Sequence, residues 1–157
     1  MNIPNNVKTF LEDTNVIKTL TTVDSEGNPH SVPINSFSVM DDGNIAFMEL
    51  LDTCQTQKNM LNCYWFKKDV SILIMGDWGK GEAFQLKGIP CKFLTEGPVW
   101  DKYLAMIWKV IPKADPSGVW LITPKGIRNQ NYFVRRKGEE DRRYNWAKWF
   151  TFKGTRE

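Results

Sequence analysis

Residues 16–50 read VIKTLTTVDSEGNPHSVPINSFSVMDDGNIAFMEL and contain the clearest secondary-structure signal in the chain. Two segments within it, SEGN at 25–28 and DDGN at 41–44, are rich in residues that tolerate the backbone angles of tight turns. The runs around these turns are rich in β-branched and aromatic residues, which are typical of strands. The pattern predicts three consecutive strands at about residues 16–24, 30–40 and 45–50.

The rest of the chain adds more strands and a few helices. Helical spacing of apolar residues predicts helices at 4–13, at 53–63 with Thr53 or Asp52 as N-cap, and from Pro98 onward. Further strands are predicted at 70–75, 82–94, 119–123 and 127–134, the last two being separated by a turn at 124–126. We therefore expect a single mainly-β domain over residues 1–157, a six- to seven-stranded barrel with added helices.

One predicted strand, 82–94, changes the face on which its apolar residues lie. Phe84 and Leu86 share one face, whereas Ile89 and Cys91 have the opposite parity. Gly88 stands between the two pairs, and a bulge or bend there would turn both toward one core. We expect this strand to bend at Gly88, as the strands of a small barrel must.

Two segments in the second half of the chain are strongly aromatic. The helix that begins at Pro98 is expected to pack one apolar stripe into the core, formed by Trp100, Leu104, Ile107, Trp108 and Ile111. Residues 135–157 form a basic and aromatic extension, which we expect to pack on the barrel or on a partner subunit.

Composition limits the classes of function. The net charge is +3, but residues 125–157 carry ten Lys and Arg against four Asp and Glu, so nucleic-acid binding is an alternative that this modest overall charge does not favour. Three cysteines without a C-x-x-C unit and a single histidine, His30, argue against a zinc site and a His-based hydrolase. No apolar run is long enough to cross a bilayer and no secretory signal precedes the first strand, which indicates a cytoplasmic protein.

Two segments combine groups that could bind a ligand. Val32-Pro33-Ile34-Asn35-Ser36 contains a proline that cannot donate a ladder hydrogen bond, so it is expected at a sheet edge with backbone groups free for a planar ring. Thr53-Cys54-Gln55-Thr56-Gln57-Lys58-Asn59 starts a helix directly after a strand, and unpaired amides there can bind an anion. An ordinary edge strand and an ordinary capped helix remain the alternatives.

A third candidate region is the loop that contains Trp78 and the strand that follows it. Trp78 lies between Gly76 and Gly79 beside Lys80, where it could stack on a ring or on a partner chain. Gln85 faces away from its apolar neighbours, so it could hydrogen-bond a ligand or water.

Five pieces of the chain, in this order, resemble the FMN-binding split-barrel family, which includes pyridoxamine 5'-phosphate oxidases and small bacterial FMN-binding proteins. They are TTVDSEGNPHSVPINSF, VMDDGNIAF, QTQKNM, GEAFQLKG and FLTEGPVWD, between residues 20 and 103. The similarity is greatest to the small FMN-binding proteins. It implies a split β-barrel and a homodimer with FMN at the subunit interface.

The resemblance also assigns roles to residues. The 32–36 segment would lie along the flavin ring, and Gln55, Thr56 and Asn59 would hold the phosphate, with Thr53, Cys54 and Gln85 beside the cofactor. A tryptophan of the other subunit, Trp108, Trp120 or Trp146, would close the ring pocket. Members of the family usually carry Lys or Arg where this chain has Gln55, so phosphate binding should be weaker unless Lys58, Arg128 or Arg135 replaces that cation.

The function expected from the resemblance is flavin-dependent oxidoreduction with an unknown substrate. The chain lacks the arginine-rich substrate segment of a true pyridoxamine-phosphate oxidase, so that activity is not expected. The alternative is a non-catalytic FMN-binding electron carrier or flavin store.

Overall fold

The structure is a computed structural model that describes residues 1–138, except for the side chain of Trp78. Its elements run in the order α1 (Asn5–Glu12), β1 (Ile17–Val23), β2 (Pro29–Pro33), β3 (Ser38–Val39), β4 (Ile45–Glu49), α2 (Gln55–Trp65), β5 (Val70–Met75), η1 (Trp78–Lys80), β6 (Ala83–Leu94), α3 (Pro98–Val110) and β7 (Gly118–Asn129). The predicted extension at 135–157 lies almost entirely outside the described residues.

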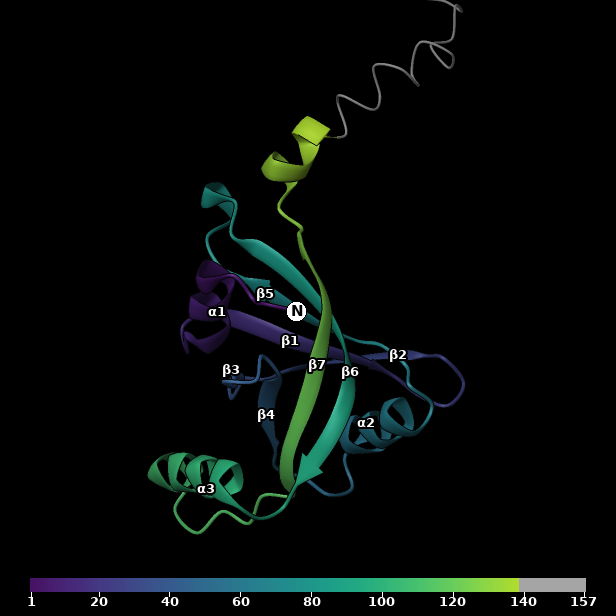
Figure 1. The fold of residues 1–157 in the computed structure, drawn as a ribbon, viewed down its shortest axis with the longest axis vertical. Helices are drawn as coiled ribbons and strands as arrows, with labels where there is room; N and C mark the ends of the chain where they lie inside the picture. Colours follow the sequence, from purple (N-terminus) through teal and green to yellow (C-terminus); the bar gives the residue numbers. More distant parts are fainter. Residues whose placement is uncertain (139–157) are drawn as a thin grey trace, which may run out of the picture.

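All seven strands belong to one antiparallel sheet in the order β2-β1-β5-β6-β7-β4-β3. The long strands β6 and β7 run through its middle, and α2 and α3 lie toward the same end of the molecule (Figure 1). The hydrogen-bond ladder does not close, because β2 and β3 form two separate edges. The prediction of a mainly-β fold with six to seven strands is confirmed, whereas a closed barrel is not seen among the described residues.

The predicted irregularity of β6 at Gly88 is confirmed, but the expectation that it turns both apolar pairs toward one core was wrong, because Leu86 is buried in the main core whereas Cys91 packs against a separate cluster. The pairing of β6 with β7 shifts register between Lys87 and Gly88, and again between Pro90 and Lys92. A Cβ atom built on Gly88 would lie 2.6 Å from the carbonyl oxygen of Thr123, so no other residue fits at this crossing without movement.

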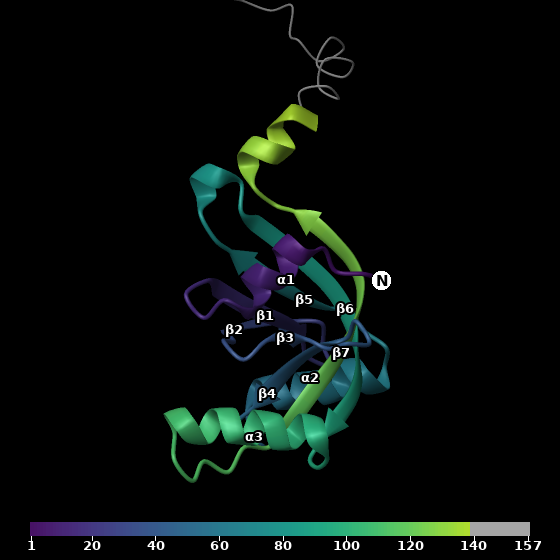
Figure 2. The same ribbon diagram turned by 60° about the vertical axis from the view of Figure 1, so that its left-hand side comes forward.

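Two clusters of buried side chains lie on opposite faces of β4. Ile45 and Phe47 point into the main core, where Trp120 and Leu20 are also buried. Ala46 and Met48 join a second cluster beneath α3. Figure 2 shows α3 lying across β4 and β7 at this end of the sheet. Because side chains pack on both faces of β4, every residue of this strand is buried. The same packing holds the end of β4, which borders the site described below.

Several expectations about element boundaries were wrong. The predicted strand 30–40 is split into β2 and β3, since β2 ends at Pro33 and residues 34–37 belong to neither ladder. The predicted strands 119–123 and 127–134 are one strand, β7, that runs through Pro124 and ends at Asn129. Pro124 is tolerated because the β6–β7 register shifts beside it, at the kind of bulge where a missing N–H costs no ladder bond.

The apolar stripe predicted for α3 is only partly correct. Ile107 packs against the second cluster, but Trp108 and Ile111 are about half exposed. Tyr103, which the prediction left out, is the buried residue of this helix. In residues 1–138, no helix combines the length and the hydropathy needed to cross a bilayer.

Candidate functional site

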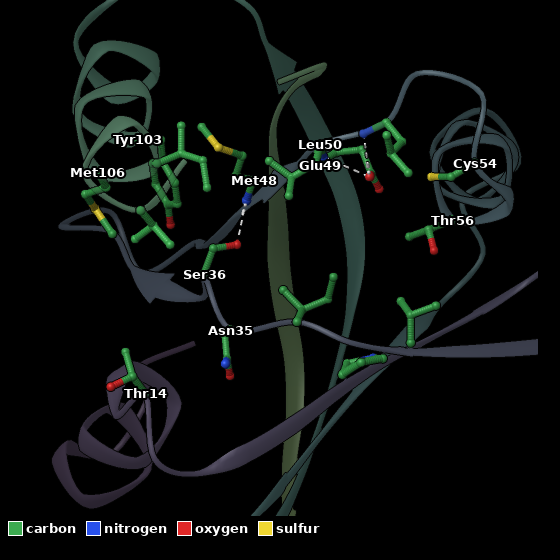
Figure 3. A pocket seen from close by; sticks show the side chains of 16 residues that line it. Thr14, Asn35, Ser36, Met48, Glu49, Leu50, Cys54, Thr56, Tyr103 and Met106 are labelled. Atoms are coloured by element: carbon green, nitrogen blue, oxygen red, sulfur yellow. Dashed lines mark hydrogen bonds between the residues drawn. The ribbon is translucent and has the colours of Figure 1, made fainter. Parts of the chain in front are cut away.

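A cleft of about 610 Å³ opens between the β2–β3 connection, the end of β4, the start of α2 and one side of α3. Figure 3 shows Asn35 and Ser36 on one wall, Met48 to Leu50 on the facing wall, and Cys54 and Thr56 at the end formed by α2. The lining is mostly apolar, with a few polar groups between. It is formed by Thr14, Val32, Pro33, Ile34, Asn35, Ser36, Met48, Glu49, Leu50, Leu51, Cys54, Thr56, Tyr103, Met106, Ile107 and Val110.

The first wall follows from the proline in β2. β2 pairs only with β1 and is an edge strand, as predicted, and its ladder ends at the pair Thr19 and Pro33. Beyond Pro33 the chain leaves the sheet, tied by the N–H of Ile34 to the carbonyl of Lys18 at 3.0 Å. The Ser36 hydroxyl then accepts a hydrogen bond from the N–H of Met48 at 3.0 Å. All five residues of the 32–36 segment therefore line the cleft.

The start of α2 differs in detail from the expectation. The N-cap is Cys54, whose Sγ accepts from the N–H of Gln57 at 3.3 Å, rather than Thr53 or Asp52. Burial, together with the negative charge of Glu49, raises the pKa of the Cys54 thiol, so this cysteine is held as a neutral thiol. The first turn of α2 contains no acidic residue, and the partial positive charge of the helix N-terminus favours a negative group nearby, such as Glu49.

Thr56 is buried at the cleft end, and its Oγ1 lies 3.3 Å from Nε2 of His30. This contact makes His30 a half-buried support for the first turn of α2, although His30 itself does not line the cleft. Thr56 and Cys54 are thus the residues of the predicted phosphate segment that reach the cleft.

The other residues of that segment lie outside the cleft. Asn59 is buried, donates to Oγ1 of Thr22 at 3.0 Å and accepts from Nε2 of Gln55 at 2.7 Å, so it fastens α2 to β1. Gln55 and Thr53 are exposed and do not line the cleft. Lys58, the proposed replacement cation, is exposed on α2.

Two further predicted residues are placed away from the cleft. Gln85 donates to Oγ of Ser71 at 2.9 Å and accepts from Nε2 of Gln130 at 2.7 Å, in a separate polar hollow that also contains Arg128. Trp120 is buried in the main core and donates its Nε1–H to Oε1 of Gln57 at 2.7 Å. A buried core residue cannot reach a partner's pocket, which corrects the suggestion for Trp120.

For Trp108 and Trp146, the suggestion that a tryptophan closes the partner's ring pocket stays a prediction. Trp108 is exposed on α3, with its Nε1–H bonded to the carbonyl of Ala114 at 2.9 Å. Trp146 lies outside the described residues.

Tyr103 is a cleft residue that the sequence analysis missed. Its hydroxyl donates to the carbonyl of Ala46 at 3.0 Å and lies 2.6 Å from Oγ of Ser38. Burial raises its pKa to about 12. The hydroxyl therefore pins α3 to β4 and is unsuited to proton transfer near neutral pH. The spacing of Tyr103, Ile107 and Val110 on one helical face was a usable signal for this wall.

Glu49 is the other missed residue, at the end of β4. Its side chain is 7% exposed. Oε1 accepts from the backbone N–H groups of Leu50 and Leu51 at 2.9 and 3.2 Å. Oε2 is buried and has no N–H or O–H donor among the described residues, and the Cys54 thiol, a weak donor, contacts the carboxylate. Glu49 was not selected from the sequence, because a glutamate at the end of an apolar strand is usually exposed to solvent.

Within residues 1–138, no three side chains of His, Cys, Asp or Glu gather as metal ligands would. The mostly apolar lining of the cleft, with a few polar groups, suits an organic molecule with a large apolar part.

No protein-family model matches the sequence, and no curated protein matches it. Solved structures do match. HupZ from Group A Streptococcus is 22% identical with a TM-score of 0.65, covering 82% of this chain and 94% of HupZ. A protein from Lactobacillus delbrueckii, described as a candidate pyridoxamine 5'-phosphate oxidase, is 16% identical with a TM-score of 0.62, covering 81% of this chain and 93% of its own.

An FMN-binding protein from Syntrophomonas wolfei is 12% identical with a TM-score of 0.61, over 77% of this chain and 81% of that one. The fold does not decide the cofactor, because HutZ from Vibrio cholerae, described as a heme storage protein, also matches with a TM-score of 0.57. These identities establish the architecture and no more: the chain has the fold of the pyridoxamine 5'-phosphate oxidase-like and FMN-binding proteins.

Proposed function

We propose that this protein binds FMN in the cleft and acts as a flavin-dependent oxidoreductase. The observation that carries the proposal is the convergence of two predicted segments: the 32–36 edge and the start of α2 form one cavity in a fold that includes FMN-binding and oxidase-like proteins. The flat apolar wall suits a tricyclic ring, and the amides at the helix start suit an anionic group.

The residues that would hold the cofactor divide into two groups. Val32, Pro33 and Ile34 offer apolar contact to one ring face, with Asn35 and Ser36 adding polar and main-chain groups. Cys54 and Thr56, with Gln55 between them in the sequence, would face the phosphate. When bound, the flavin supplies hydride or electron transfer. The chain's own part is to bind, orient and shield, in keeping with a Tyr103 hydroxyl and a Cys54 thiol that both hold their protons.

We further propose that the protein is a homodimer in the cytoplasm, with the cleft at the subunit interface. In this proposal the sheet of each subunit forms one split barrel. The support is the exposed apolar rim of the cleft. Met106 and Val110 of α3 are 46% and 77% exposed, and Leu51 beyond β4 is 63% exposed. An apolar rim of this kind is unfavourable in water and marks a contact surface.

A heme-binding function is the second candidate, because HutZ shares the fold. The cleft offers Met48, Met106, Cys54 and Tyr103 as side chains of types that ligate heme iron, but Tyr103 is already engaged and His30 stands outside. The residues therefore suit a flavin better. A non-catalytic FMN carrier uses the same site and differs only in turnover.

The test is a titration of the purified protein with FMN and, separately, with hemin, followed by removal of unbound ligand on a sizing column. The proposal expects a flavin spectrum to travel with the protein at one flavin per chain in a dimeric peak. A heme spectrum with no retained flavin would reverse the assignment. Steady oxidation of a reduced flavin by an organic acceptor would separate enzyme from carrier.

A further inference from the structure

Glu49 is buried in a way that calls for a ligand. A carboxylate that loses water without a cation or a full set of donors is costly, so such a group in a native fold needs a partner. Two ion pairs of the described residues, Lys80 with Asp77 and Lys125 with Asp69, do not involve Glu49 or any residue that lines the cleft. One carboxylate oxygen is satisfied by two amides, and the other, Oε2, is not.

The position of Glu49 in the cleft limits which part of a bound ligand can lie next to it. Figure 3 shows it between Met48 and Cys54, across from Ser36. It thus lies on the wall that faces the 32–36 segment, beside the end proposed for the phosphate. The Cys54 thiol hydrogen-bonds the Glu49 carboxylate, but a thiol is a weak donor and does not replace an N–H or O–H group.

The chemistry of a buried carboxylate excludes some partners. It repels a phosphate placed directly against it, and it gains nothing from an apolar ring atom. It binds an O–H or N–H donor strongly, because the hydrogen bond is charge-assisted. In FMN the part between ring and phosphate is a sugar-alcohol chain with three free hydroxyl groups on adjacent carbons, each of which can donate.

We infer that the Oε2 atom of Glu49 accepts a hydrogen bond from a hydroxyl of the flavin's sugar-alcohol chain, making Glu49 a residue that selects flavins carrying this chain. The inference rests on the proposed function and deepens it. The carboxylate fixes the middle of the cofactor, while the ring and the phosphate are held at either side.

The experiment compares riboflavin, which has the hydroxyl chain and no phosphate, with lumiflavin, which has the ring and neither. Binding is measured by quenching of flavin fluorescence. The wild-type protein is expected to bind riboflavin at least tenfold more tightly than lumiflavin. In Glu49→Gln the riboflavin affinity should fall about fivefold, and in Glu49→Met about tenfold or more, with lumiflavin affinity unchanged in both.

Glu96→Gln is the matched control, since Glu96 is exposed and outside the cleft. Thermal unfolding of each variant checks that the β4 end is intact, and the comparison of the two flavins on wild-type protein needs no variant at all. Equal wild-type affinities for the two flavins, or equal losses for both in the Glu49 variants, would overturn the inference and leave flavin binding standing. Failure of the wild-type protein to bind either flavin would defeat the proposed function itself.

Discussion

Replacing Gln55 by lysine should tighten FMN binding. Gln55 is exposed on the first turn of α2, next to Thr56, where the resemblance described above implies a lysine or arginine. A hydrogen bond to a charged group contributes about 1.5–3 kcal/mol, against about 0.5–1.5 kcal/mol for a neutral one. The difference, about 1 kcal/mol after allowance for solvent screening at an exposed site, corresponds to roughly fivefold in affinity.

The same substitution has a structural cost that must be separated from its effect on binding. The Gln55 amide donates to Oδ1 of buried Asn59 at 2.7 Å, and its loss should lower the unfolding free energy by about 1 kcal/mol. In a chain of this length that is about 2–4 °C in melting temperature. Gln55→Met loses the same hydrogen bond without adding charge, so it is the matched control.

The assay is fluorescence titration with FMN and with riboflavin on the wild-type protein and both variants. Gln55→Lys should bind FMN roughly fivefold more tightly than Gln55→Met, with riboflavin the same in the two. Equal FMN affinities, or an equal gain for riboflavin, would refute the placement of the phosphate at the α2 start.

Four further predictions concern the ligand, the interface and the fold. Thr56→Ala should weaken FMN binding about fivefold in the same titration, and an unchanged affinity would place the phosphate elsewhere. Val110→Glu should shift native mass toward the monomer, because Val110 is 77% exposed on the apolar rim, whereas exposed Lys109→Glu should not. Gly88→Ala should cost about 1–3 kcal/mol in chemical unfolding, since its Cβ would meet Thr123, while Gly126→Ala, with open space, should be near neutral; similar values would contradict the crossing geometry. Burial raises the pKa of folded Tyr103 to about 12, whereas an unfolded tyrosine loses its proton near pH 10, so the folded protein binds more protons in that window. The unfolding free energy should therefore fall there by about 2–3 kcal/mol, and a Tyr103→Phe variant with the same alkaline slope would show the burial to be wrong.

The strands and their order along the chain could be predicted because alternation and turn chemistry are local. The irregularity at Gly88 could also be predicted, since a change of parity around a glycine indicates a bulge, but the cluster that each side chain joins could not. The turn expected at 124–126 was wrong for a physical reason: proline and glycine also occur at bulges, and only the partner strand decides between the two.

The site was predicted in part. The 32–36 edge and the α2 start could be found from the sequence, because a proline and a helix terminus leave backbone N–H or C=O groups without partners wherever they occur. Glu49 and Tyr103 could not, because their roles depend on which strand and helix pack together across the cleft. Asn59 was chosen for its place near a helix start, yet its face turns to β1 and its amide holds the fold.

Flavin retention is the most direct test of the account. Apo protein mixed with excess FMN and passed over a sizing column should emerge as a yellow dimer with one flavin per chain. Protein that emerges colourless, with all the FMN eluting as free ligand, would contradict the central claim.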